Sequence, residues 1–361
     1  MKNSRRFFWV KFGILSALAT LIKLVSLSPA LVENAYSAHI YPAIAMVLRL
    51  LTAWLPISVG DVLYAAAILW LLVRAVKLVK LLIRRQNSWA GFWQGVANFM
   101  LSILTVYILF YALWGLNYSR RGISYQLQLT QQRYTTADLK HVTALLVEKV
   151  NSQRSQLGDS LFTYPPIKTI YGVAALAYDS AAKQNPFLQY RHACIKNSLF
   201  GTLNNYFGFL GYYNPFTGEA QVNTKVPSFI IPYTACHEIA HQVGYGSESE
   251  ANFVGYLAAK ASGNHILLYS TYADLFSYAN SELYVRDSSA ARANFYLLDT
   301  LVKQDYRQYR KFMLSYKNPI EPVLRLFYGQ YLKANNQPKG IDTYNEVVAW
   351  IIAYEKKYGN L

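Results

Sequence analysis

The chain has 361 residues and a mass of 41.1 kDa, and 53 % of its residues are hydrophobic whereas only 15 % are charged. With a mean hydropathy of +0.11, it is too apolar for a disordered protein and unusually apolar for a soluble one. Its 2 cysteines exclude a disulfide-built scaffold and any zinc module with several cysteine ligands. The net charge is +16, and residues 1–116 hold 11 Lys and Arg against 2 acidic residues. Since the apolar runs lie there too, the charge indicates membrane topology and not nucleic-acid binding.

Three apolar stretches in this first third predict membrane-spanning helices. They cover residues 8–28, 61–83 and 92–116. A helix needs roughly 20 residues to cross the hydrocarbon core, and the third stretch reaches this length without a charge. The second stretch is weaker because its last third is basic. The first is expected to be an uncleaved anchor, since its apolar run is long and no clear signal-peptide cleavage pattern follows it.

Basic residues in the short loops set the expected orientation. The loop between the first and second spans carries Arg49 as its only basic residue. Further basic residues precede the first span or lie around the connection from the second span to the third: Lys2, Arg5, Arg6, Lys77, Lys80, Arg84 and Arg85. We therefore expect a multi-pass protein of the cytoplasmic membrane, with its N-terminus inside and residues 117–361 outside. Arg120 and Arg121, just after the third span, depart from this pattern.

Residues 39–55 form a further apolar helix candidate, which Arg49 interrupts. If this stretch crosses the membrane, residues 117–361 lie in the cytoplasm instead. Its length of 17 residues and its central arginine favour a helix that lies in the membrane interface or packs on the bundle.

After the third span the chain becomes mixed in composition and rich in tyrosine, with enough residues for one large domain or two small ones. Residues 136–151 carry apolar side chains at helical spacing and predict an amphipathic helix. Residues 219–226 alternate between apolar and polar, which predicts a strand with one apolar and one polar face. Helices are expected from there to the C-terminus. The expected fold is α+β and mostly helical, with a membrane region at 1–116 and a domain at 117–361.

A motif with chemical meaning follows the predicted strand directly. Residues 237–241 read His-Glu-Ile-Ala-His, an HExxH sequence. Two histidines four residues apart on a helix project from the same face and can bind one metal ion. Glu238, beside the first histidine, can hold a metal-bound water and take its proton. The alternative is a helix whose two partly buried histidines are held by hydrogen bonds alone.

A zinc site of this kind needs a third protein ligand and leaves the fourth position open. Gly244 and Gly246 end the first helix, and Ser247 opens another. Ser247 and Glu250 have the spacing of a capping box, in which Glu250 turns back to the Ser247 amide. Glu248 then stays free, so we expect it to be the third ligand, with Glu250 as the alternative. Both glutamates also suit ordinary first-turn acids, which the helix dipole favours.

Neighbouring residues support one ligand set and exclude others. Asn252 shares the helical face of Glu248 and can therefore support a ligand from behind. Metzincins place a third histidine six residues after the second, where this chain has Ser247. Cys236 lies roughly 100° around the helix from His237, so it is expected to point away from the metal.

The segment Asn214–Ala258, together with the three upstream apolar stretches, resembles the DUF3810 family of bacterial membrane proteins of unknown function. The resemblance covers nearly the whole chain. An HExxH followed by a helix that begins Glu-x-x-Ala is also similar to the gluzincin pattern of membrane-embedded CaaX-processing-type and ImmA-like metallopeptidases. This similarity implies a zincin-like metallopeptidase domain in which the glutamate three residues before the alanine binds zinc. Carried over, that residue is Glu248, three before Ala251, although its link to His241 is very short for a gluzincin.

These features predict a membrane-anchored zinc metallopeptidase that hydrolyses peptide bonds in peptides or proteins. His237, His241 and Glu248 hold Zn²⁺, and Glu238 acts as base for the water and then as acid for the leaving amine. The polar face of the strand at 219–226 pairs with an extended substrate. The alternative is a non-catalytic, zinc-stabilised envelope protein that binds a partner or peptide through the same groove. Glu238 favours the enzyme, because a structural site has no use for an ionised carboxylate beside its ligands.

Two further features stay open at this stage. Cys194 and Cys236 are able to pair if the domain lies outside the cytoplasm, and buried free thiols are at least an equal expectation. Hydrolysis also needs a donor for the developing oxyanion, and the sequence singles out none of the many tyrosines. Oligomeric state leaves no mark in the sequence.

Overall fold

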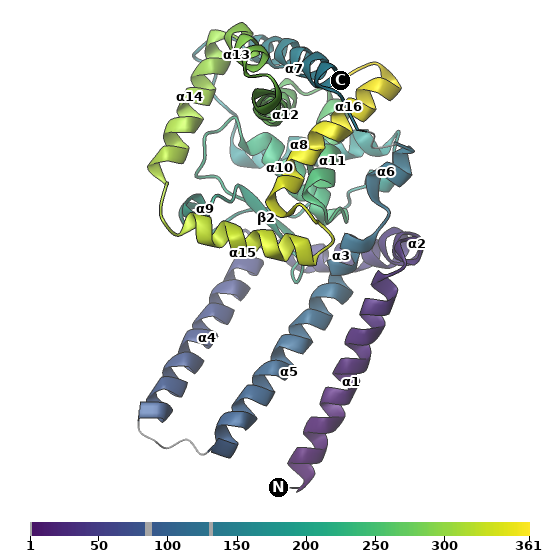
Figure 1. Cartoon of the computed structure of the whole chain (residues 1–361), viewed down its shortest axis with the longest axis vertical. Coiled ribbons are helices and arrows are strands. Elements are labelled where there is room, and N and C mark those ends of the chain that lie inside the picture. Colours follow the sequence, from purple (N-terminus) through teal and green to yellow (C-terminus); the bar gives the residue numbers. More distant parts are fainter. Residues whose placement is uncertain (1, 84–88, 130–132) are drawn as a thin grey trace.

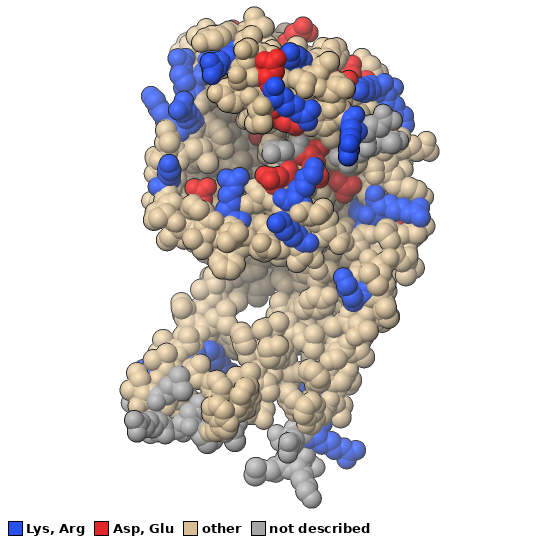
Figure 2. Space-filling model, in the orientation of Figure 1, with Lys and Arg blue, Asp and Glu red and all other residues tan. Residues whose placement is uncertain are grey.

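The computed structural model describes residues 2–83, 89–129 and 133–361. Three long helices form legs beneath a globular domain (Figure 1): α1 (Lys2–Ser26), α4 (Val59–Ile83) and α5 (Trp89–Leu113). Their segments long and apolar enough to cross a membrane are Arg6–Ser26, Val59–Leu81 and Gly91–Leu113. The three long apolar helices predicted from the sequence are thus confirmed. Figure 2 shows that most charged side chains on this face gather on the domain, whereas only a few basic ones lie on the legs.

The third long helix ends at Leu113, before the predicted end at residue 116. The chain turns there into the 3-10 helix η2 (Gly115–Ser119). The indole of Trp114, 4 % exposed, donates a hydrogen bond of 2.9 Å to the backbone carbonyl of His241. The end of this helix is therefore fixed by a contact with the HExxH segment.

The segment between the first two legs lies along the base of the domain (Figure 1) and contains α2 (Pro29–Leu31), the π-helix η1 (Val32–Ile40) and α3 (Tyr41–Thr52). Helix α3 covers most of the uncertain stretch 39–55. Its Tyr41 hydroxyl donates to the Gln242 carbonyl at 2.8 Å, and Arg49 donates to the same carbonyl at 3.2 Å. Arg49 also donates to the Arg191 carbonyl at 3.0 Å. The stretch packs against the domain and not only on the bundle, and protein carbonyls account for its central arginine.

Arg120 is a second charge that packing explains. Its guanidinium donates to both carboxylate oxygens of Glu33 in η1, at 2.7 and 2.9 Å, and to the carbonyl of Gly244 at 2.9 Å. This buried pair holds the segment between the legs against the domain. Arg120 is therefore explained by its partner and is not counted among the basic loop residues that indicate the cytoplasmic side. Two residues that the predicted orientation uses, Arg84 and Arg85, lie outside the described residues.

The domain is mostly helical and contains a small three-stranded sheet, as expected for the coarse fold class. Its helices are α6 (Gly122–Leu127), α7 (Thr136–Gln156), α8 (Ile167–Ala182), η3 (Pro186–Leu188), α9 (Gly201–Phe207), α10 (Ile231–Gln242), α11 (Glu248–Ser262), α12 (His265–Arg286), α13 (Ser288–Leu297), α14 (Thr300–Ser315), α15 (Glu321–Ala334), η4 (Gly340–Glu346) and α16 (Val347–Tyr358). Its strands are β1 (Ile195–Asn197), β2 (Gly211–Asn214) and β3 (Glu219–Val222). The strand order is β1-β3-β2, with β1 parallel and β2 antiparallel to β3.

The strand predicted at 219–226 is shorter and more enclosed than expected. β3 ends at Val222, occupies the centre of the sheet and is buried on both faces. Its Glu219 carboxylate accepts hydrogen bonds from the backbone N–H groups of Val59 at 3.0 Å and Gly60 at 2.6 Å. The first N–H groups of a helix lack partners within it, so a carboxylate is favoured at the start of α4. Glu219, on the polar side of the alternation, therefore meets the start of the long apolar helix α4 and not solvent.

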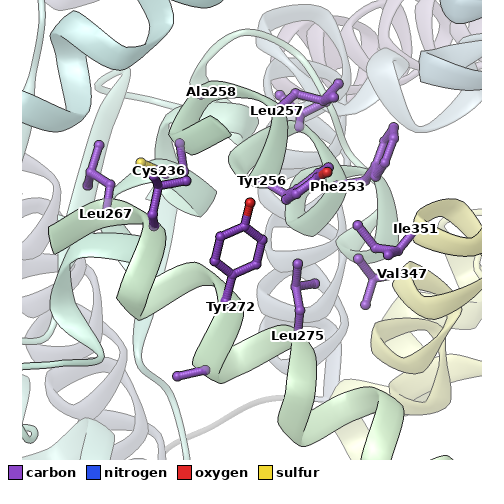
Figure 3. Packing of buried hydrophobic residues seen from close by; sticks show 14 of the residues in the cluster. Cys236, Phe253, Tyr256, Leu257, Ala258, Leu267, Tyr272, Leu275, Val347 and Ile351 are labelled. Carbon is purple, nitrogen blue, oxygen red and sulfur yellow. The ribbon is translucent and has the colours of Figure 1, made fainter. Parts of the chain in front are cut away.

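The domain core surrounds the HExxH helix. Figure 3 shows side chains from α10, α11, α12 and α16 packed together, among them Phe253, Tyr256 and Leu275. Helix α7, predicted at 136–151, is confirmed, extends to Gln156 and packs along α12. Burial of these apolar side chains holds α10 and α11 against each other, which positions the candidate site.

Candidate metal centre

The HExxH residues lie on α10, and the chain reverses directly after it. Pro232 occupies the first turn of α10, where its missing N–H costs nothing. After Gln242, Gly244 adopts a φ of +93°, which favours glycine, and a Cβ there would lie 3.0 Å from the Tyr41 ring. The tight reversal brings Glu248, the first residue of α11, back to the histidine-bearing face of α10.

Two imidazole nitrogens and one carboxylate oxygen converge at this face. Nε2 of His237 and Nε2 of His241 are 3.1 Å apart. Oε2 of Glu248 lies 3.2 Å from the first nitrogen and 3.4 Å from the second. A tetrahedral zinc ion with bonds of about 2.0–2.1 Å has neighbouring ligand atoms about 3.3–3.4 Å apart. The three atoms therefore match one face of a zinc tetrahedron, and the residues fit the metal.

Both histidine rings are held from behind. Oδ1 of Asn252 lies 2.7 Å from Nδ1 of His237, and the carbonyl oxygen of Tyr245 lies 2.7 Å from Nδ1 of His241. Because both oxygens are acceptors, each Nδ1 carries the ring proton and each Nε2 presents a lone pair to the centre. Asn252 lies where the sequence predicts it, whereas a backbone carbonyl such as that of Tyr245 leaves no signal in the sequence.

Protein donors do not satisfy the atoms of this centre. Oε2 of Glu248 lies off the N–H directions of both rings and accepts no hydrogen bond from the described residues. A proton on one Nε2 would join the two rings and still leave this oxygen without a donor. Burial lowers the pKa of His241, but the Glu248 carboxylate outweighs it and raises that pKa to about 9. The centre thus attracts positive charge, and a cation between the three atoms satisfies all of them.

The other side of Glu248 is held by residues that sequence reasoning missed. The hydroxyl of Tyr328 on α15 donates to Oε1 at 2.8 Å. The Glu248 backbone N–H donates to Oε1 of Gln337 at 3.1 Å. These partners lie far along the chain and belong to no motif, so only the folded arrangement reveals them.

Glu250 does not form the predicted capping box. The Ser247 side chain makes no capping bond and instead lies 3.1 Å from the hydroxyl of Ser249. Oε1 of Glu250 accepts a hydrogen bond of 2.8 Å from the backbone N–H of Ile123, in the first turn of α6. The first N–H groups of a helix have no partner within it, so the start of α6 offers Glu250 a donor. Glu250 is engaged elsewhere, as predicted, but the predicted reason was wrong.

Glu238 lies beside the three converging atoms and is 3 % exposed. Its Oε2 accepts no hydrogen bond from the described residues, and burial raises the pKa of its carboxyl to about 7. Strand β2 approaches it closely, because a Cβ on Gly211 would lie 2.5 Å from Oε1 of Glu238. Only a glycine permits this approach without displacing the carboxylate.

Two cavities meet at the centre and share His237, Glu238 and Tyr344 as lining residues. The smaller cavity, about 250 Å³, is rich in tyrosine and is also lined by Asp274. Burial raises the pKa of Asp274 to about 7. The larger cavity, about 550 Å³, is lined in part by α4 and α5. The candidate centre is thus accessible from two chemically different sides.

Cys194 and Cys236 are both free and buried. Cys194 lies against α3, with its Sγ 3.4 Å from the hydroxyl of Thr52. Cys236 belongs to the core packed behind α10 (Figure 3) and is not part of the metal-ligating group. The structure therefore favours free thiols over a disulfide.

The family model for proteins of unknown function DUF3810 matches residues 36–352. The chain therefore belongs to this family, as its resemblance implies. No curated protein and no solved structure matches the chain. The likeness to gluzincins therefore has no matching relative behind it and rests on the sequence pattern and the geometry of the site.

Proposed function

We propose that this member of the DUF3810 family is a membrane-anchored zinc metallopeptidase. His237, His241 and Glu248 are the metal ligands, and Glu238 carries the proton. The observation that supports this most is the spacing of the three ligand atoms, 3.1 to 3.4 Å, with their lone pairs turned to one point. Beside them, Oε2 of Glu238 accepts no hydrogen bond from the described residues.

Bound zinc supplies a Lewis acid that polarises a carbonyl and lowers the pKa of water. Glu238 takes a proton from the attacking water as the new C–O bond forms. It then gives that proton to the amide nitrogen as the C–N bond breaks, so that a carboxylic acid and an amine leave. The oxyanion needs a donor, and our candidate is Tyr344, whose ring stacks 6.5 Å from that of His237 and which lines both cavities.

The sheet favours a peptide as substrate. β2 is an outer strand, and Gly211 brings its backbone against Glu238. An extended peptide that adds to β2 runs past the proton carrier, with main-chain hydrogen bonds giving affinity. β3, at 219–222, was expected to play this part, but it has strands on both sides and offers no edge.

We further propose that the domain lies outside the cytoplasmic membrane. The N-terminus and the end of α4, with Lys77 and Lys80, lie at the end of the legs away from the domain (Figure 1). Basic residues favour the cytoplasmic side. A phosphatase that is active only outside the cytoplasm, fused after Leu361, should be active, whereas the same enzyme fused after Ile83 should not. The reverse pattern would contradict this orientation.

The catalytic assignment is tested on the full chain, because residues 32–58 pack under the domain. Glu238→Gln should retain zinc and lower kcat on a peptide library about 10²- to 10⁴-fold, the usual contribution of a general base. Glu355→Gln is the matched control, since this glutamate lies 3.3 Å from His141 and belongs neither to the three-residue metal group nor to the lining of the two cavities. It should change neither zinc content nor rate. If the zinc-loaded wild type cleaves nothing, the non-catalytic, zinc-stabilised alternative is favoured.

A further inference from the structure

The larger cavity at the metal centre has one wall made by a membrane helix. Four residues of α4 line it at positions that share one helical face: Tyr64, Ala67, Ile68 and Leu71. Phe110, in the last turn of α5, and Trp114, directly after that helix, line it from another side. Apart from the metal centre itself, no charged side chain among the described residues lines this cavity. Seven tyrosines, Tyr64 included, line it, but most of its lining is aliphatic or aromatic, so it is a mainly apolar chamber that ends at the candidate zinc site.

The α4 wall extends into the depth of the membrane. It lies within Val59–Leu81, which is apolar enough to span. The start of α4 is held by the domain, where Glu219 accepts from the Val59 and Gly60 amides, and Leu71 lies about 18 Å further along the helix. Ile68 and Leu71 are 55 % and 46 % exposed. The lower part of the wall is therefore exposed on a segment that is apolar enough to lie in hydrocarbon.

The chamber has a side opening between two legs. Helix α1 packs along α5, whereas α4 stands apart from that pair (Figure 1). Figure 2 shows an opening between the legs directly beneath the domain. An apolar group is thus able to move from the bilayer to the metal centre without crossing water.

The second, smaller cavity indicates which end of a bound substrate is polar. It lies on the other side of His237 and Glu238 and carries the Asp274 carboxylate among tyrosines. A molecule that occupies both cavities is apolar on the bilayer side of the metal and polar on the other side. The apolar volume of about 550 Å³ falls in the range of small-molecule sites, about 300–1,000 Å³, and suits a linear chain.

We propose that the substrate is a lipid-modified peptide whose acyl chain enters between α4 and α5 and fills this chamber. The peptide bond to be cleaved then lies over the metal at the membrane surface, with the peptide leading into the Asp274 cavity. This inference rests on the proposed function, because it assigns the substrate class of the same site.

The test compares two tryptophan substitutions on neighbouring alanines of α4. Ala67→Trp narrows the chamber, whereas Ala66, about 100° around the helix from Ala67, does not line the chamber, so Ala66→Trp is the matched control. The probes are a peptide hydroxamate, which binds zinc directly, and the same hydroxamate with a palmitoyl chain. Affinity is measured on zinc-loaded full chain in phosphatidylcholine nanodiscs. Partition of the chain into the bilayer raises the affinity of both variants equally, so only their difference reports on the chamber.

We expect the palmitoyl chain to increase affinity in the wild type and in Ala66→Trp. Ala67→Trp should lose about tenfold of that gain, the factor that corresponds to about two buried methylene groups. Leu71→Trp, deeper in the same wall, replaces Ala67→Trp if that variant does not fold. If the palmitoyl chain increases affinity equally in Ala66→Trp and Ala67→Trp, the proposal is overturned. The proposal is also overturned if palmitoyl lysophospholipid at equal concentration abolishes that increase in affinity. If neither hydroxamate binds the zinc-loaded protein, the proposed function itself fails, which is a distinguishable result.

Discussion

Two regions of this molecule bury carboxylates and treat them differently. At the junction between the long apolar helices and the domain, both oxygens of Glu33 and of Glu219 accept hydrogen bonds from protein donors. At the metal centre, Oε2 of Glu238 and Oε2 of Glu248 accept none from the described residues. Buried polar atoms are normally paired. Protein donors satisfy the carboxylates at the junction, whereas the unpaired oxygens at the centre leave room for a cation and a substrate to bind.

The largest expected effect is a loss of stability when the buried ion pair at the junction is broken. Glu33→Gln removes the countercharge of the buried Arg120 guanidinium, to which Glu33 is joined at 2.7 Å. Loss of one partner of a buried pair costs about 3–5 kcal/mol. Thermal or denaturant unfolding of the full chain in detergent measures this loss, which should be the same with and without zinc.

The matched control for that variant is an exposed pair. Lys140 and Asp287 lie 2.6 Å apart, with side chains 46 % and 30 % exposed. Exposed pairs contribute little, so Lys140→Ala should leave the free energy of unfolding nearly unchanged. Equal losses in Glu33→Gln and Lys140→Ala would show that the junction pair is not the stabilising contact we infer.

An intermediate effect, on zinc affinity, is expected from the residue that orients a histidine ligand. Asn252→Ala frees the His237 ring from the bond of 2.7 Å that orients it. Loss of such a partner lowers metal affinity about 10- to 100-fold, which competition with a chromogenic chelator measures. Asn280→Ala, which breaks a bond of 3.2 Å to the Ala291 carbonyl away from the centre, should leave zinc affinity unchanged. Equal affinities in the two variants would remove Asn252 from the site.

The smallest effect concerns Asp274 in the polar cavity. Burial raises its pKa from 3.8 to about 7, so the folded state holds a proton that the unfolded state has lost between about pH 4 and 7. Stability therefore falls as pH rises through this window. A shift of this size corresponds to at most about 4 kcal/mol, and we expect roughly 1 kcal/mol because Asp274 is only partly buried and lines a cavity. Asp274→Asn removes the charged form and should therefore raise the Tm by about 2–4 °C at pH 8, with no gain at pH 4. A gain that does not depend on pH would contradict this assignment.

The parts of the fold and the site that could be predicted depend on patterns within short stretches of the sequence. The apolar runs predict the three long helices, and the HExxH spacing brings His237 and His241 to one face because both lie on one helix. Asn252 follows from the same helical geometry. Glu248 was preferred over Glu250 for a capping reason that the structure contradicts, so agreement there rests on the Glu-x-x-Ala resemblance.

Contacts between distant segments were not predictable. Arg49 and Arg120 look like topology signals in the sequence, but each bonds to groups that only folding brings near. The polar face at 219–226 looks solvent-exposed until Glu219 meets the start of α4. Tyr328, on α15, reaches Glu248 from a segment with no motif. In each case the partner lies far along the chain, where period and spacing carry no information.

The most direct test of the account measures zinc in the purified full chain by elemental analysis, with Glu248→Gln and Glu250→Gln beside the wild type. Oε2 of Glu248 faces the two histidines, whereas Glu250 bonds to the Ile123 amide. We predict about one zinc ion per chain in the wild type and in Glu250→Gln, and loss of zinc in Glu248→Gln. Equal zinc in both variants, or none in the wild type after zinc loading, would contradict the metal centre.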